Sequence, residues 1–324
     1  MKLCTFSVGS ATSHVGVALS GDRVLDVTAA MASDSRYASL LSIMEHEAVA
    51  LPAIRTLMRD VAASPPSDRM PVFDLRSVTL HVPYRPPQIR CFSVYEQHLK
   101  NAFGQVLKNE FGFFARLLLG TLGMAKIPKA FYAAPAYYKG VRMNLSGHLD
   151  AVSRPRPGGK LDYEAELGVV VGRRGKDIDK ARAMSHVFGY VVFNDFSERD
   201  QLMKEMRTRP SPGPAKGKDF DGSNALGPWI VTADEVRDPH ALEVSVRVNG
   251  QLRGQGSTAL MTHRIDSIVS YASWNETLHP GELLATGCVP NCAGIEQWRF
   301  LQDGDRVDVD ITGLGALSNT ITAQ

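Results

Sequence analysis

Residues 161–172 read LDYEAELGVVVG, and this stretch decides how the rest of the chain is interpreted. From Gly168 onward it is uncharged, rich in β-branched residues and closed by a glycine, which is typical of a buried strand. Before that point, Glu164 and Glu166 stand two residues apart and therefore project to one face of the strand, with Ala165 on the other. Their Cα atoms are expected to lie roughly 6.6 Å apart, twice the rise per strand residue.

Two interpretations of this acidic pair are open. Charged residues usually mark a solvated face, so Glu164 and Glu166 could sit at an exposed strand end. However, two carboxylates on one face repel each other and resist desolvation, and a bound divalent cation would relieve both costs. Because Mg²⁺ and Ca²⁺ prefer oxygen ligands, the pair is also a candidate metal site.

The composition is that of an ordinary soluble globular protein, with 44% hydrophobic and 22% charged residues. The length of 324 residues favours one large domain with a smaller one appended. A proline-rich passage at residues 80–87 reads as the connection, so we predict a small N-terminal domain at residues 1–85 and a larger domain at residues 86–324. A formal net charge of +2 without a basic block argues against nucleic acid as the main partner.

The four cysteines are too sparse for a disulfide framework, and no histidine is spaced to complete a zinc site with Cys288 and Cys292. Free thiols in a reducing compartment are therefore expected. The N-terminus enters a strand-like pattern without a signal-peptide hydrophobic run, and the most apolar stretch, residues 111–124, is too short to span a bilayer. We expect a soluble, cytoplasmic protein without a membrane partner.

Several elements can be placed along the chain. Alternating valines and a Gly-Asp turn predict a small β-meander over residues 3–28, and helical spacing of apolar residues follows at 39–61 and at 95–119. His98 falls in the first turn of the last of these helices, where a histidine can be structural, exposed or catalytic. Asn249-Gly250, preceded by alternating valines, predicts a tight hairpin.

Two further features accompany the acidic strand. A second buried strand, residues 187–193, runs directly into Asp195, which is well placed to hold a third carboxylate beside the first two. Residues 213–220 superficially suggest a phosphate loop, but the glycine spacing is one residue short and Asp219 stands where Ser or Thr is required. This segment is instead predicted to be a loop that presents Lys218.

From about Arg90 to the C-terminus, about three quarters of the chain, these segments resemble the fumarylacetoacetate hydrolase family. The landmarks occur in the family's order and register. They are Tyr95-x-x-His98, residues 161–168, residues 193–197, Gly217-Lys218-x-Phe220, Thr277-Leu278-x-Pro280-Gly281-Glu282 and Gly304-Asp305. The resemblance implies an α+β, β-rich fold, in which a mixed C-terminal β-roll encloses the site and a small β-containing domain precedes it, and it also implies a homodimer.

The resemblance also implies site residues. Glu164, Glu166 and Asp195 match the family's metal-binding carboxylates, which usually hold Mg²⁺, with Ca²⁺ or Mn²⁺ as alternatives. Lys218 matches the active-site lysine, and Tyr138 resembles the substrate-facing tyrosine. His98 matches the histidine that, paired with a glutamate, activates water.

The partner glutamate and several other positions depart from the family pattern. Short members take the glutamate three residues after the histidine, where this chain has Asn101, so Glu296 in the later Ala-Gly-Ile-Glu segment is the candidate. Cys91 stands where the fully elaborated hydrolases have a fourth metal-site aspartate. Cys288, at the predicted substrate-binding position, replaces a threonine that often contacts the bound carboxylate. Leu202 stands in place of a glutamine, with Gln201 shifted by one.

Three functions follow as alternatives. The first is a metal-dependent hydrolase of the carbon–carbon bond in a diketo or acylpyruvate-type acid, in aromatic or small-acid catabolism. His98 and Glu296 would activate water, and Lys218 would stabilise developing negative charge. The second is a decarboxylase or isomerase of 2-oxo acids on the same metal site. The third is a catalytically impaired homologue that binds a ligand without turnover, which the cysteines at 91 and 288 favour.

Overall fold

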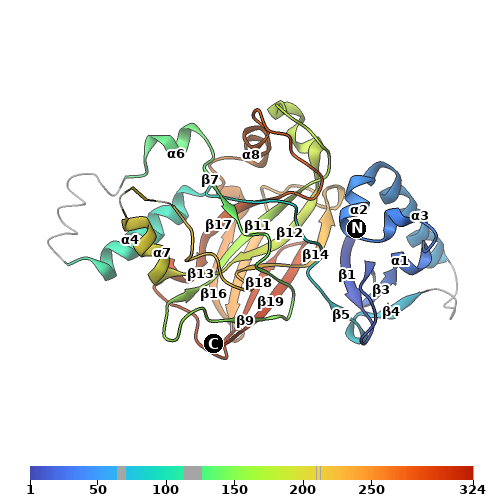
Figure 1. Cartoon of the computed structure of the whole chain (residues 1–324), viewed down its shortest axis with the longest axis horizontal. Coiled ribbons are helices and arrows are strands. Elements are labelled where there is room, and N and C mark those ends of the chain that lie inside the picture. Colours follow the sequence, from blue (N-terminus) through green and yellow to red (C-terminus); the bar gives the residue numbers. More distant parts are fainter. Residues whose placement is uncertain (64–70, 113–125, 209, 212, 324) are drawn as a thin grey trace.

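The computed structural model describes residues 1–63, 71–112, 126–208, 210–211 and 213–323. It has the predicted strand-rich α+β architecture, built on one large sheet and one smaller sheet (Figure 1). In spatial order the large sheet contains β4 (Val72–Asp74), β3 (Arg23–Asp26), β2 (His14–Leu19), β1 (Lys2–Ser7), β14 (Asn224–Thr232), β12 (Val187–Asp195), β11 (Glu164–Val171), β17 (Leu283–Ala293), β6 (Ile89–Phe92) and β7 (Tyr137–Gly140).

Two marginal strands, a smaller sheet and a separate strand pair complete this framework. At the margins of the large sheet, β5 (Thr79–Leu80) pairs with β1 and β8 (Leu145–Ser146) pairs with β14. The smaller sheet contains β16 (Gln251–Ser257), β15 (Glu243–Val248), β18 (Arg306–Ile311), β19 (Gly315–Thr322) and β9 (Ala151–Ser153). A separate pair joins β10 (Leu161–Asp162) to β13 (Ser197–Glu198).

The two larger sheets share one hydrophobic core. Ala165, Leu167 and Val169 of β11 belong to the same buried cluster as Val244 of β15 and Val309 of β18. Along β15 and β18, buried residues alternate with more exposed ones. Every residue of β11 and β12 is buried, because those two strands are central and covered on both faces. Residues 164–171 therefore lie in the middle of the fold.

The helices lie around the large sheet. The α-helices of the described residues are α1 (Val27–Ala30), α2 (Leu40–Glu45), α3 (Glu47–Ala63), α4 (Glu96–Glu110), α6 (Lys129–Ala133), α7 (Arg199–Arg207) and α8 (Ile265–Ala272). Figure 1 shows α4, α6 and α7 at one end of the molecule and the N-terminal helices α1, α2 and α3 at the other. No helix among the described residues is long and apolar enough to cross a membrane.

The predicted N-terminal meander is confirmed, since β1, β2 and β3 pair antiparallel. This meander continues the large sheet, because Leu3 of β1 pairs with Ile230 of β14. The division into residues 1–85 and 86–324 stays a prediction. The Asn249-Gly250 hairpin is also confirmed, with β15 and β16 antiparallel and both turn residues at positive φ.

Two predicted helices differ in extent. Residues 39–61 form α2 and α3, separated at His46, rather than one helix. The helix predicted at 95–119 is described as α4, which ends where Phe111 becomes extended and Gly112 follows. Residues 113–119 of that prediction, and most of the apolar stretch 111–124, lie outside the described residues.

Candidate active site

The acidic pair lies inside the protein and not at a solvated strand end. Glu164 and Glu166 are 7% and 1% exposed, so the solvent-facing interpretation is wrong. The physical reason is that β11 is a central strand, hydrogen-bonded to β12 on one side and β17 on the other. The register between β11 and β17 shifts on either side of Glu166, which marks an irregularity of the sheet at the site.

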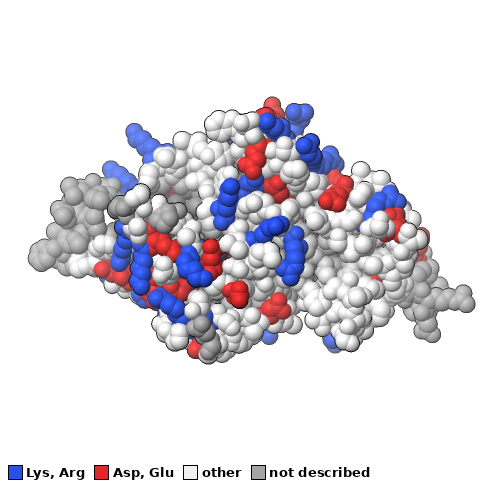
Figure 2. Space-filling view, in the orientation of Figure 1, with Lys and Arg blue, Asp and Glu red and all other residues white. Residues whose placement is uncertain are grey.

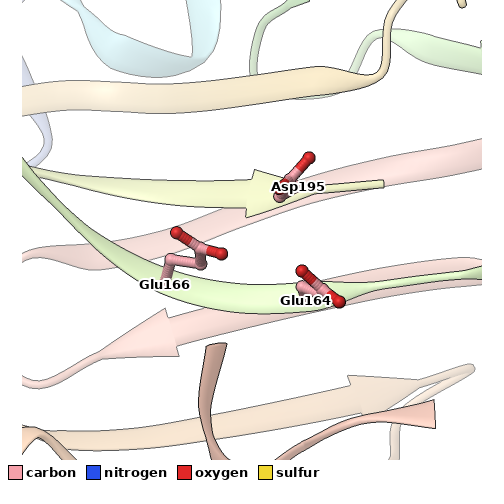
Figure 3. A group of neighbouring side chains, drawn as sticks. All are labelled: Glu164, Glu166 and Asp195. Carbon is pink, nitrogen blue, oxygen red and sulfur yellow. The ribbon is translucent and has the colours of Figure 1, made fainter. Parts of the chain in front are cut away.

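Asp195, at the end of β12, joins the pair. In Figure 3 the two glutamate side chains come from one strand and Asp195 from the end of its neighbour. One carboxylate oxygen from each of the three residues lies within 4.8 Å of the others, and all three side chains are buried. The Tyr138 hydroxyl donates to Asp195 Oδ2 over 2.5 Å. The structure thus brings together the three predicted metal carboxylates and Tyr138.

Two buried cations face these carboxylates. Lys218 Nζ lies 2.8 Å from Glu164 Oε2 and 2.7 Å from Asp195 Oδ2. The Arg199 guanidinium contacts Glu164 Oε1 at 2.5 Å and donates through Nε to Asp162 Oδ2 at 2.7 Å. Asp162, Glu164, Glu166 and Asp195 together carry four formal negative charges against two positive ones, which leaves an excess of two negative charges.

The pKa shifts reflect this excess. Burial, together with the charges of Asp195 and Glu164, raises the pKa of Glu166 well above its ordinary value. Burial also raises the pKa of Asp195, although Lys218 opposes the effect. At Glu164, burial is outweighed by Lys218 and Arg199, which hold the pKa of that carboxyl below its usual range. Burial disfavours the charge on Lys218 itself, but Asp195 and Glu164 raise the pKa of the ammonium, so it stays cationic.

These residues fit a divalent cation. A doubly charged ion would balance the two excess negative charges and favour the ionised forms of Glu166 and Asp195. Asp195 Oδ1 is buried and has no hydrogen-bond partner among the described residues, so this oxygen is available as a ligand. Hard divalent cations prefer oxygen donors of this kind.

Gly287 borders the same carboxylates. Its N–H donates to Glu166 Oε2 over 2.8 Å. Its φ is +90°, and a Cβ at this position would meet the carbonyl oxygen of Phe92 at 2.6 Å, so only glycine is accommodated. The next residue, Cys288, pairs with Glu166 across the sheet and is 3% exposed, as a free thiol. All four cysteines are free, as predicted.

His98 and Glu296 form the predicted pair. His98 lies in the first turn of α4, and its Nδ1 is 2.9 Å from Glu296 Oε1. Both side chains are buried, with His98 9% exposed and Glu296 7% exposed, so the surface interpretation of this histidine is wrong. Asn101, which replaces the glutamate of short family members, points its amide at the same Glu296 oxygen from 3.5 Å.

Asp162 connects this pair to the acidic strand. Its Oδ1 accepts the N–H groups of Tyr163 and Gly294 at 2.9 and 2.7 Å, and its Oδ2 accepts the Ile295 N–H at 3.0 Å. Gly294 and Ile295 begin the 3₁₀ turn η6 (Gly294–Glu296), so a fully buried carboxylate holds the turn that ends in Glu296. The Arg199 contact ties the same carboxylate to α7.

Helix α7 fixes the loop that presents Lys218. The Glu205 carboxylate accepts the N–H groups of Ala215 and Gly217 at 3.0 and 3.1 Å. A Cβ on Gly217 would lie 2.7 Å from the backbone nitrogen of Leu202, so the loop packs directly on the helix. Gln201 donates to Glu205 at 3.0 Å, and Leu202 rather than this glutamine lines the cavity that contains the three carboxylates.

One cavity of about 470 Å³ brings these groups together. Its lining includes all three candidate metal carboxylates, Lys218, His98, Tyr138, Cys91 and Cys288. Glu296 is held behind His98 and is absent from that lining. Every predicted site residue therefore lies in this cavity or directly behind it.

Three residues outside the predicted site also contribute to it, namely Asp162, Arg199 and Glu205. A sequence signal exists for Asp162, which alternates with Glu164 and Glu166 and so shares their side of an extended chain. For Arg199 and Glu205 we find no such signal, because the carboxylate and loop groups that they hold lie ten or more residues away along the chain.

Comparisons with known proteins identify the family of this chain. The family model described as fumarylacetoacetate (FAA) hydrolase C-terminal matches residues 95–322. A protein of Burkholderia orbicola named "Putative hydrolase" is 39% identical over 184 residues, which is 56% of this chain. The chain spans 64% of that relative's length.

Two solved structures extend the comparison to the whole chain. Fumarylacetoacetate hydrolase from the psychrophile Exiguobacterium antarcticum is 29% identical, with a TM-score of 0.72 and 100% coverage of both chains. Maleylpyruvate hydrolase from Sphingobium sp. SYK-6, in complex with manganese(II) and pyruvate, is 24% identical. Its TM-score is 0.71, over 100% of this chain and 99% of that one, which shows a common fold.

Proposed function

Because the chain belongs to the fumarylacetoacetate hydrolase family, we propose that it is a metal-dependent hydrolase of a carbon–carbon bond. Its substrate would be an acylpyruvate-type acid, R–CO–CH₂–CO–COO⁻, met in the breakdown of aromatic compounds or small acids. The observation that carries this proposal is the hydrogen-bonded His98–Glu296 pair, with His98 lining the same cavity as three buried carboxylates and Lys218.

The metal would be held by Glu164, Glu166 and Asp195, with Mg²⁺ as the proposed ion and Mn²⁺ or Ca²⁺ as alternatives. Manganese(II) is the ion in the maleylpyruvate hydrolase complex, which supports a divalent cation as the proposed cofactor. When bound, such an ion can be chelated by two neighbouring oxygens of a 2-oxo acid, and its positive charge stabilises an enolate.

His98 supplies the base. Its Nδ1–H donates to the Glu296 carboxylate, so the free Nε2 is the nitrogen that accepts a proton from water. The water oxygen forms a bond to the acyl carbonyl carbon, and the bond from that carbon to the CH₂ group breaks. Its electron pair passes to the CH₂ carbon, which gains a proton and completes pyruvate, while the acyl group leaves as R–COO⁻ with release of one proton.

Lys218 and Tyr138 complete the polar wall. The Lys218 ammonium, cationic and buried, lies between Glu164 and Asp195, where it can stabilise developing negative charge on the substrate. Tyr138 donates to Asp195 and so holds that carboxylate in place. A direct substrate contact for Tyr138 and for Cys288 stays a prediction.

Decarboxylation or isomerisation of a 2-oxo acid is the second candidate. The observation that favours it is that the site is built from two sets of elements. Strands and a loop place the carboxylates and Lys218, whereas α4 and the turn η6 place His98 and Glu296. Enolate stabilisation would then proceed without an activated water.

Parallel assays of acylpyruvate cleavage and oxaloacetate decarboxylation, in wild type and His98→Ala, separate the two. We expect the variant to lose acylpyruvate cleavage by roughly a hundred- to ten-thousand-fold, the usual cost of removing a general base. Its calorimetric Mn²⁺ affinity should stay unchanged, because His98 is not a proposed ligand. Decarboxylation by wild type without any acylpyruvate cleavage, and at the same rate in His98→Ala, would replace the hydrolase with the lyase. Binding of metal without either reaction would indicate the impaired homologue.

A further inference from the structure

The cavity has a chemically distinct second wall. The three carboxylates come from strands of the sheet, whereas α4 and α7 contribute a set of apolar lining residues, the second wall. The apolar lining residues include Phe92, Leu99, Ala102, Leu202, Met206 and Pro214, and the hydroxyl-bearing Ser93 and Tyr137 also line the cavity. The acyl group of an acylpyruvate would have to lie against this wall if its dioxo end faces the carboxylates.

Two of these residues belong to one face of α7. Leu202 and Met206 are four positions apart, so their side chains lie one above the other on the helix. Leu202 is 9% exposed and Met206 is 51% exposed, which places the leucine deep and the methionine at the mouth. A large apolar side chain that is half exposed beside a cavity can still bury apolar surface, and an apolar ligand would cover that surface.

Helix α4 continues the same wall from the proposed base. His98 and Ala102 are also four positions apart and both line the cavity, with Leu99 beside them. An acyl carbonyl carbon close to His98 would therefore have its substituent directed along the helix towards Ala102. The described lining residues of the two helices, among them Ala102, Leu202 and Met206, offer carbon surface.

The charged groups of the cavity are already engaged. Among the described lining residues the cations are Arg199 and Lys218, and each lies within 2.8 Å of two carboxylates of the site. Gln201, the amide next to Leu202, donates to Glu205 instead of facing the cavity. A second carboxylate on the acyl group would thus meet no free cation or amide among the described residues of this wall, which is costly.

We propose that the site selects acylpyruvates whose acyl group is uncharged and apolar, with Leu202 and Met206 as specificity-determining residues. This inference rests on the proposed function, since it concerns the substrate of the same site. Each additional methylene of the acyl group that moves from water onto this wall should raise kcat/KM roughly fourfold until the cavity is filled. A terminal carboxylate should lower it by at least about tenfold relative to an apolar group of the same shape.

A matched pair of substrates tests the preference. Isocaproylpyruvate and succinylpyruvate have the same heavy-atom skeleton and differ only in an isopropyl group against a carboxylate. We expect kcat/KM to be at least about tenfold higher for isocaproylpyruvate with the Mn²⁺-loaded wild type. Equal or higher kcat/KM for succinylpyruvate would overturn the inference while leaving hydrolysis intact.

A binding measurement keeps the inference testable if no acylpyruvate is cleaved. Calorimetry on the Mn²⁺-loaded protein compares 5-methyl-2-oxohexanoate with 2-oxoglutarate, which are again isosteric apart from the terminal group. Tighter binding of the apolar acid without turnover would sustain the inference and remove the hydrolase function. Equal binding, tighter 2-oxoglutarate binding or no binding of either acid would overturn the inference.

Paired variants locate the preference on α7. Met206→Arg places a cation at the mouth, on a side chain that is 51% exposed and can accept it. We expect the isocaproyl-to-succinyl ratio to fall at least about tenfold in this variant, because the carboxylate gains a partner. Met143→Arg makes the same change on a 69% exposed methionine outside the cavity lining, and its ratio should match wild type. A ratio that does not change in Met206→Arg, or that falls equally in both variants, would remove α7 from the proposal.

Discussion

At the scale of single residues, Asp162 ties the acidic strand to the turn that carries Glu296. Its two oxygens accept three backbone N–H groups and one guanidinium N–H. In Asp162→Asn the amide NH₂ would face at least one of these donors, and the turn would shift relative to His98. We expect kcat to fall by roughly a hundredfold, because displacements of about 1 Å have that effect. The free energy of unfolding should fall by about 3–5 kcal/mol, as for other broken buried pairs.

Two measurements distinguish positioning by Asp162 from a general loss of structure. The pH profile of kcat should shift in Asp162→Asn, because the orientation of the His98–Glu296 pair changes, while calorimetric Mn²⁺ affinity persists. Asp60→Asn, at an exposed position of α3, is the control and should change neither quantity. A wild-type pH profile with full activity in Asp162→Asn would show that the turn does not depend on this carboxylate.

Glu166 and Asp195 make the effect of metal on stability depend on pH. Their raised pKa values mean that the metal-free folded protein holds these protons more tightly than the unfolded chain. The resulting stabilisation is present below the ordinary carboxyl pKa and is lost as the pH rises through the raised folded values. Since a cation needs the ionised carboxylates, the rise in Tm on adding saturating Mn²⁺ should be larger at pH 8 than at pH 5.5.

The control for this dependence is Glu166→Gln, which removes one titrating ligand. In this variant the Mn²⁺-induced rise in Tm should be smaller and should change less between the two pH values. A metal effect on wild-type Tm that is larger at pH 5.5, or the same at both pH values, would contradict the proposed ligand set.

At the scale of elements, α7 and the loop that presents Lys218 form one unit. Gly217 allows the loop to contact the helix backbone, and a Cβ there would lie 2.7 Å from Leu202 N and 2.8 Å from Leu202 Cα. In Gly217→Ala either the loop or the helix must move, which should cost about 1–3 kcal/mol in the free energy of unfolding and displace Lys218. We therefore expect a lower Tm and a lower kcat from the same substitution.

Gly104→Ala is the matched control, because Gly104 lies inside α4 and a Cβ there meets nothing within 4 Å. Alanine in a helix interior should raise the free energy of unfolding by about 0.5–1 kcal/mol. Wild-type Tm and kcat in Gly217→Ala would show that the loop and α7 are not coupled.

The central strands were predictable because their signals are local. The β-branched run at 169–171, the apolar run at 187–193 and the Asn249-Gly250 turn each indicate a strand or hairpin within ten residues. The short strands β7, β8 and β9 lie within a turn-rich region and were not predicted. Backbone pairing with β6, β14 and β19 holds them extended, whereas their own sequence has no strand pattern.

The site was predictable for a different reason. The landmarks of the family resemblance indicate which residues converge, whereas residue patterns alone left Glu164, Glu166 and His98 open between functional and ordinary roles. Burial of the acidic pair depends on both neighbouring strands, and the pairing of His98 with Glu296 spans 198 positions. Neither fact has a local sequence signal.

At the scale of the whole molecule, the face in Figure 2 shows Lys and Arg side chains interspersed with Asp and Glu, in keeping with the formal net charge of +2. The absence of a nucleic-acid partner stays a prediction. We also expect a homodimer, the commonest closed assembly of soluble proteins. Light scattering at micromolar concentration should give about twice the 35.4 kDa chain mass, and a monomer's mass would count against the dimer.

Hydrolysis of a carbon–carbon bond at a metal-loaded carboxylate site is measured most directly by following isotope from water. Metal-stripped protein is given isocaproylpyruvate in ¹⁸O-labelled water, Mn²⁺ is titrated in, and the products are analysed by mass spectrometry. We expect no reaction without metal and, on loading, equal amounts of pyruvate and isocaproate, with one new ¹⁸O in the isocaproate carboxylate. Pyruvate formation that persists in the stripped protein, or loss of carbon dioxide with no labelled isocaproate, would contradict the proposed reaction.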